Sequence, residues 1–175
     1  MSVPLLFGKL PARGDFIWRG FDPGERDALD AWLSAELAAA RADLGEGFDA
    51  AFDAAPPWRF AWRDAGAWTA GAMAPSVDAA GRRFPLLLAV AGRAAEEVAD
   101  AAAACEDRLY ALIGDGAPDV VVEAPVRIAR GGGGARPEGE GWWSAMIGGR
   151  EEARLEGRRP DGLLLRMLAP AEDGA

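Results

Sequence analysis

Within its 175 residues the sequence has no histidine, a single cysteine and, among 19 basic residues, a single lysine, Lys9. Without histidine the chain cannot build imidazole general bases, serine–histidine–aspartate triads or histidine-containing metal sites. Cys105 has no partner for a disulfide within the chain, and one thiolate is too few for a metal cluster. We therefore expect no catalytic residue, no metal and no cofactor.

Long hydrophobic runs and an excess of positive charge are also missing. No apolar stretch approaches the ~18 residues that a membrane-spanning helix needs. Residues 1–10 lack the basic start and long apolar run of a signal peptide. The formal net charge of -9 repels phosphate backbones. We expect a cytoplasmic protein with no membrane insertion and no nucleic-acid partner.

The sequence does contain enough apolar surface for a packed domain. Half of its residues are hydrophobic and seven are tryptophan, which argues against disorder. A chain of this length accommodates one domain with a real core. We predict a single domain over residues 1–175, in which residues 170–175 form a disordered tail.

Apolar residues at helical spacing predict two main helices. Asp22 and Pro23 suit the start of the first helix, and Gly45 suits its end. The second helix is predicted over residues 94–113, and Cys105 lies on its apolar stripe as a small core residue. The two stripes consist of Leu29, Trp32, Leu33, Leu37, Ala40 and Leu44, and of Val98, Ala101, Ala102, Cys105, Leu109, Leu112 and Ile113.

Alternating and continuous apolar runs predict the strands. Residues 58–63 and 68–74 are predicted to form a hairpin with a turn at residues 64–66. The alternation in the first strand places Trp58, Phe60 and Trp62 on one face. Residues 86–90 are continuously apolar, as in a central strand that is covered on both faces. Further strands are predicted at residues 4–7, 126–130, 142–147 and 163–168, with a flexible loop at 131–134.

The order of these elements predicts the fold class. Strands and helices are mixed without the regular strand–helix alternation of a parallel sheet. We therefore expect an α+β domain in which a mainly antiparallel β-sheet packs against about two main helices.

Two segments rich in glycine, proline and charged residues carry the strongest motifs. The first reads FGKLPARGDF over residues 7–16, and the second reads APSVDAAGRRFPL over residues 74–86. Glycine permits tight turns, and proline stiffens the flanking chain. The candidate site residues in these segments are Gly8, Lys9, Pro11, Arg13, Gly14, Asp15, Phe16, Pro75, Ser76, Asp78, Gly81, Arg82, Phe84 and Pro85.

Together the two segments resemble the signature stretches of the TagF family, also called ImpM. The sequence WRF at 58–60 and the pair Trp142–Trp143 resemble further family features. The resemblance implies a post-translational repressor of type VI secretion that acts by protein–protein binding. It implies a forkhead-associated (Fha) secretion component as partner, with a separate PP2C-type phosphatase as a further candidate.

The residues themselves leave two interpretations of the signature segments open. In the structural one, Asp15 and Asp78 accept loop N–H groups as Asx turns and pair with Arg13 or Arg82. In the functional one, the two loops meet at one end of the sheet. Their charged residues, including Lys9, then form a polar recognition patch.

A third interpretation is a small-ligand-binding protein or an enzyme that uses the loops Gly8–Asp15 and Pro75–Pro85. Ser76 and Lys9 would then form a serine–lysine dyad. Asp15 and Asp78 would alternatively hold a hard cation such as Mg²⁺, although two carboxylates are a thin ligand set. A phosphate-binding P-loop is excluded, because no serine or threonine follows Lys9.

The adjacent pair Trp142 and Trp143 suggests an aromatic anchor for a partner. Neighbouring strand residues point to opposite faces of a sheet. One of the two rings should therefore be exposed unless both faces are covered, and exposed tryptophans often dominate binding energy.

Overall fold

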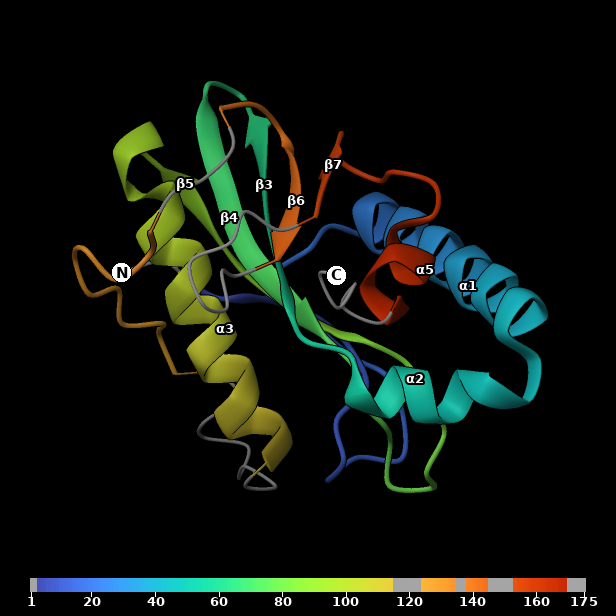
Figure 1. Cartoon of the computed structure of the whole chain (residues 1–175). Helices are drawn as coiled ribbons and strands as arrows, with labels where there is room; N and C mark the ends of the chain where they lie inside the picture. The colour runs from blue at the N-terminus through green and yellow to red at the C-terminus, as the bar shows by residue number, and fades with distance from the viewer. Residues whose placement is uncertain (1–2, 115–123, 135–137, 145–152, 170–175) are drawn as a thin grey trace.

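The computed structural model describes residues 3–114, 124–134, 138–144 and 153–169. In this part of the chain, seven antiparallel strands form one sheet in the order β2-β1-β5-β4-β3-β6-β7 (Figure 1). The predicted α+β class with an antiparallel sheet is confirmed. The strands are β1 (Leu5–Gly8), β2 (Ile17–Arg19), β3 (Trp58–Asp64), β4 (Ala67–Ala74), β5 (Leu86–Arg93), β6 (Gly141–Ser144) and β7 (Arg154–Glu156).

Two long helices lie on opposite sides of the sheet. They are α1 (Pro23–Leu44) and α3 (Val98–Gly114), and α3 is preceded by a 3-10 turn at Ala95–Glu97. Shorter elements are a 3-10 turn at Gly45–Gly47, α2 (Phe48–Ala54) and α5 (Leu163–Leu168). None of the helices in the described residues combines the length and apolar character needed to cross a membrane.

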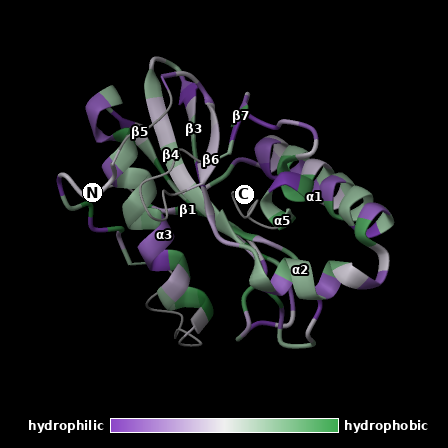
Figure 2. Ribbon diagram, in the orientation of Figure 1, coloured by the Kyte–Doolittle hydropathy of each residue, from purple (hydrophilic) through white to green (hydrophobic). Residues whose placement is uncertain are grey.

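The sequence signals at the ends of α1 act as predicted. The Asp22 carboxylate accepts the Glu25 N–H at 2.9 Å, and Pro23 occupies the first helical position. Gly45 ends the helix with φ 52°, a conformation that favours glycine. Figure 2 shows α1 alternating between hydrophilic and hydrophobic residues, as expected of a helix with one solvated face.

Each face of the sheet has its own hydrophobic core. On one face α1, α2 and α5 pack over Phe60, Trp62 and Trp142, whereas α3 packs on the other face with Cys105 in contact with the sheet. Trp142 is fully buried and Trp143 is 6% exposed, because helices or loops cover both faces. The expected exposed tryptophan is therefore absent from this pair, and neither ring is placed as a surface anchor.

The last third of the chain departs from the predicted strands. Residues 163–168 form the helix α5, because Leu163, Leu164 and Met167 bury one helical face against α1 and α2. The buried Glu36 carboxylate accepts the N–H groups of Gly162 and Leu164 at 2.9 Å each, which satisfies donors at the start of α5. The strand predicted there is wrong.

Two further predictions need correction. Residues 126–130 keep the predicted alternation of half-buried and exposed positions, but they pair with no strand among the described residues. The glycine run 131–134 is held against α3, because Gly131 and Gly133 donate to the Asp100 carboxylate at 2.9 and 2.8 Å. Strand β6 covers 141–144, and the remainder of the predicted strand 142–147, like the tail 170–175, lies outside the described residues.

Candidate functional site

The two signature loops leave the sheet at the same end. Strand β1 ends at Gly8, which pairs with Leu86 at the start of β5. Gly8 has φ 136°, and a Cβ atom there would lie 2.1 Å from the Pro85 carbonyl oxygen. The close approach of the two strands therefore requires glycine at this position. Figure 1 shows the blue loop after β1 and the green loop before β5 together beneath α2.

Asp78 is the centre of the loop structure. Its carboxylate is buried and lies 3.0 Å from Lys9 Nζ and 2.7 Å from Arg82 Nε. It also accepts the backbone N–H groups of Ala80 and Arg82 at 3.0 and 2.9 Å. Burial alone would raise the pKa of Asp78, but the Arg82 N–H and the two cations hold that pKa well below its usual range. Asp78 is therefore an ionised structural anchor.

Main-chain oxygens of the first loop bind groups of the second. Ser76 Oγ donates to the Lys9 carbonyl at 2.7 Å, and Arg82 Nη2 donates to the Gly14 carbonyl at 2.8 Å. The Ala79 N–H donates to the Arg13 carbonyl at 2.7 Å. The two loops therefore meet, as the functional interpretation supposes, and the structural interpretation holds for Asp78.

Three phenylalanine rings from the two signature segments pack together. The Phe16 ring lies 4.6 Å from that of Phe84 and 6.0 Å from that of Phe7, measured between centroids. Lys9 Nζ lies 5.2 Å from the Phe16 centroid, within cation–π range. Phe84 and Phe7 are buried, but Phe16 remains 48% exposed. The Phe16 ring is therefore partly exposed to solvent while its other side packs on Phe7, Phe84 and Lys9.

Arg83 is a member of the site that the sequence analysis did not single out. Its guanidinium binds Asp53 on α2 at 2.8 and 2.7 Å and also lies 3.1 Å from Asp49. The hydrogen bond from Arg83 lowers the pKa of Asp53. Asp49 and Asp53 are four residues apart and therefore share one face of a helix, and this acidic face was the available signal for an arginine partner.

The geometry does not support the hypotheses of a Ser76–Lys9 catalytic dyad or of a cation site at Asp15 and Asp78. Ser76 Oγ donates to a backbone carbonyl, and the Lys9 ammonium is paired with Asp78, so the two groups do not face each other as nucleophile and base. Asp15 is exposed, whereas Asp78 is buried and already carries two cations. No cluster of metal-binding side chains occurs among the described residues.

The loops expose a small surface that combines apolar and charged side chains. We call the exposed residues Gly14, Asp15, Phe16 and Arg82 the signature surface. The Arg82 side chain is 62% exposed, although one edge of its guanidinium binds Asp78 and Gly14. Pro11, Arg13 and Pro75 are half-buried beside it, Gly81 is exposed, and Lys9, Ser76 and Pro85 lie beneath. An apolar ring next to a cation and an anion suits contact with a protein.

The fold and the interlocked loops define a small α+β protein with an antiparallel sheet and a rigid polar end. The family model described as "TagF N-terminal domain, Type VI secretion system-associated" matches residues 6–123. The chain therefore belongs to the TagF family and is a type VI secretion system-associated protein.

A solved structure extends the similarity beyond the matched region. The chain is similar to PA0076 from Pseudomonas aeruginosa PAO1, known from a crystal structure at 2.05 Å resolution. The two are 25% identical and superpose with a TM-score of 0.68, over 98% of this chain and 99% of that chain. A search of the curated proteins found no match.

Proposed function

We propose that this protein is a post-translational repressor of type VI secretion that acts by binding a forkhead-associated secretion component through the signature surface. The family supports the association with type VI secretion. The observation that carries the binding role is Phe16, a half-exposed ring held by buried phenylalanines and by Lys9. A rigid apolar side chain in solvent loses little entropy on contact, so it can contribute strongly to binding.

The residues around Phe16 give this contact its orientation. Asp15 precedes Phe16 in the chain, Arg82 binds the Gly14 carbonyl two residues before Phe16, and Asp78 holds the loops beneath. Charges at the rim of an interface mainly steer and orient the partner, whereas the apolar anchor supplies most of the affinity. In this proposal the protein acts in the cytoplasm by contact and not by catalysis, and a separate PP2C-type phosphatase is a further candidate partner.

The test uses the purified forkhead-associated protein encoded with the same secretion system. Phe16→Ala should weaken its binding at least tenfold, measured by calorimetry, and relieve repression of secretion in cells. Tyr110→Ala is the matched control, because Tyr110 is 57% exposed but lies on α3. Equal affinity of the wild type and of Phe16→Ala would contradict the proposal, as would absence of any binding by the folded wild type.

A further inference from the structure

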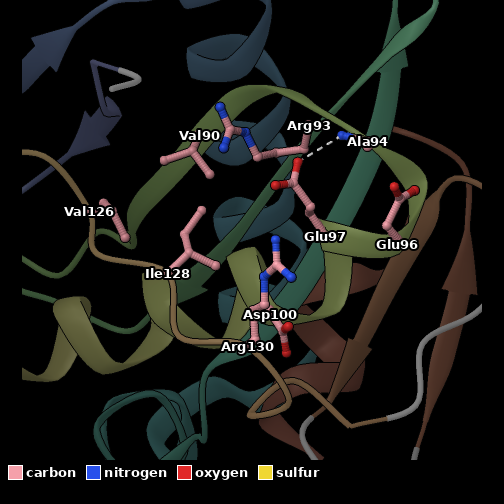
Figure 3. Close-up of a pocket in the computed structure, with 9 residues that line it drawn as sticks. All are labelled: Val90, Arg93, Ala94, Glu96, Glu97, Asp100, Val126, Ile128 and Arg130. Atoms are coloured by element: carbon pink, nitrogen blue, oxygen red, sulfur yellow. Dashed lines mark hydrogen bonds between the residues drawn. The ribbon is translucent and has the colours of Figure 1, made fainter.

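A pocket of about 670 Å³ lies at the opposite end of β5 from the signature loops. Its walls are the end of β5, the start of α3 and the extended residues 126–130 (Figure 3). Binding sites for small molecules and short peptide segments commonly have volumes of about 300–1,000 Å³. The pocket is therefore large enough to take part of a partner chain.

One wall of the pocket is aliphatic. Val126 and Ile128 on the extended segment are half-buried, and they pack against the core cluster that contains Val90, which is 1% exposed. Val126 and Ile128 are two residues apart, so they share one side of the extended chain. Arg127 between them is exposed and does not line the pocket. This wall suits an aliphatic side chain.

Opposite charges face each other across the rest of the pocket. One Glu97 carboxylate oxygen accepts the Ala94 N–H at 3.1 Å, which leaves the second oxygen as an acceptor. Figure 3 shows the Arg130 guanidinium pointing from the extended segment toward Glu97. Both residues are described by the structure, and no ion pair joins them. A bound group that both accepts from Arg130 and donates to Glu97 would complete this arrangement.

The charged side chains that line the pocket determine which kind of chemical group can bind there. Three carboxylates and two guanidinium groups line the pocket, so an ionic ligand of either sign meets like charge. Asp100 is also engaged, because its oxygens accept the N–H groups of Gly131 and Gly133. A neutral peptide group avoids the repulsion, since its carbonyl accepts from a guanidinium and its N–H donates to a carboxylate.

We propose that this pocket binds an extended peptide segment, with an aliphatic side chain against Val126 and Ile128 and the adjoining main chain between Arg130 and Glu97. The site is independent of the signature surface, because the two lie at opposite ends of β5. An eight-residue strand separates such ends by roughly 20 Å.

The test starts from a random heptapeptide library selected against the full chain. Enriched peptides should share one aliphatic position, and their affinity is measured by fluorescence anisotropy. Arg130→Ala should weaken binding about tenfold, because a hydrogen bond to a charged group is lost. Arg127→Ala, on the same segment with its side chain in solvent, should change the affinity less than twofold. Thermal unfolding checks that each variant is folded.

A second variant separates side-chain from main-chain recognition. Ile128→Ala should reduce the affinity for peptides that carry a large aliphatic residue. The loss should be smaller for the same peptides with alanine in place of that aliphatic residue. Phe16→Ala should leave peptide binding unchanged. Enrichment of peptides that bind wild type, Arg130→Ala and Ile128→Ala equally would overturn the proposal, as would selection of no peptide or of peptides that need no aliphatic residue.

Discussion

The two ends of β5 are built differently. At the end that begins with Leu86, charged groups of the signature loops form ion pairs and hydrogen bonds within the loops. Asp78 alone receives four such contacts. At the end that finishes with Arg93, a pocket remains open, and Glu97 and Arg130 face each other without pairing in the described structure. The first end presents a rigid outer surface, whereas the second has an interior that can accept a ligand.

The largest effect is expected from removing the anchor of the signature end. Asp78→Ala leaves the buried Lys9 ammonium without its carboxylate and frees two loop N–H groups. We expect the melting temperature to fall by roughly 10 °C, measured by circular dichroism. A melting temperature within two degrees of wild type, on the order of the error of such scans, would show that the loops do not depend on Asp78.

A smaller loss of stability is expected at the pocket end. A Cβ atom on Gly133 would lie 2.1 Å from the Ala99 carbonyl carbon, and backbone atoms cannot move aside easily. We expect Gly133→Ala to reduce the free energy of unfolding by about 1–3 kcal/mol, measured by urea denaturation. Gly132→Ala is the control, because its Cβ would meet nothing within 4 Å. Equal stability of the two variants would mean that the glycine run is not held against α3.

Acid should weaken the signature end. The folded-state pKa of Asp78 is lowered, so its stabilising contribution is present above the unfolded pKa of about 4 and is lost as the pH falls toward the folded value. The wild type should therefore lose more stability between pH 6 and pH 3 than Asp78→Asn does. Asp53 and Asp100, whose pKa values are also lowered, should leave a residual pH dependence in the variant. Parallel pH profiles would refute this role of Asp78.

The smallest effect is expected for the other signature carboxylate. Asp15 is exposed, in contrast to the buried Asp78. Asp15→Ala should change the free energy of unfolding by no more than about 0.5 kcal/mol, measured beside Asp78→Ala. A loss comparable to that of Asp78→Ala would erase the distinction between anchor and surface within the signature loops.

The regular parts of the fold were predictable because their local signals agree with their packing. Asp22, Pro23 and Gly45 mark the ends of α1, and the alternation of residues 58–63 predicts the face that Trp58, Phe60 and Trp62 bury. The meeting of the signature loops was one of the alternatives that the sequence left open. The pairing of Asp78 with Arg82 was another of these alternatives, but the sequence did not distinguish Asp78 from Asp15 as the anchor, because this depends on which carboxylate is buried.

The last third was harder to predict because tertiary contacts decide it. The run Leu163–Leu168 is apolar enough for a strand, and only the distant Glu36 carboxylate and the surface of α1 select a helix. Residues 126–130 alternate like a strand but pair with no strand among the described residues. Both tryptophans of the pair 142–143 are buried because each face of the sheet carries its own core cluster, with Trp142 in one and Trp143 in the other.

The most direct test is hydrogen exchange of this protein alone and in complex with the forkhead-associated protein. The account predicts that binding slows exchange in residues 9–16 and 75–85, around Phe16 and Arg82. It predicts unchanged exchange in residues 90–100 and 124–133. Protection confined to the second set, with none in the signature loops, would contradict the assignment of the signature surface as the interface.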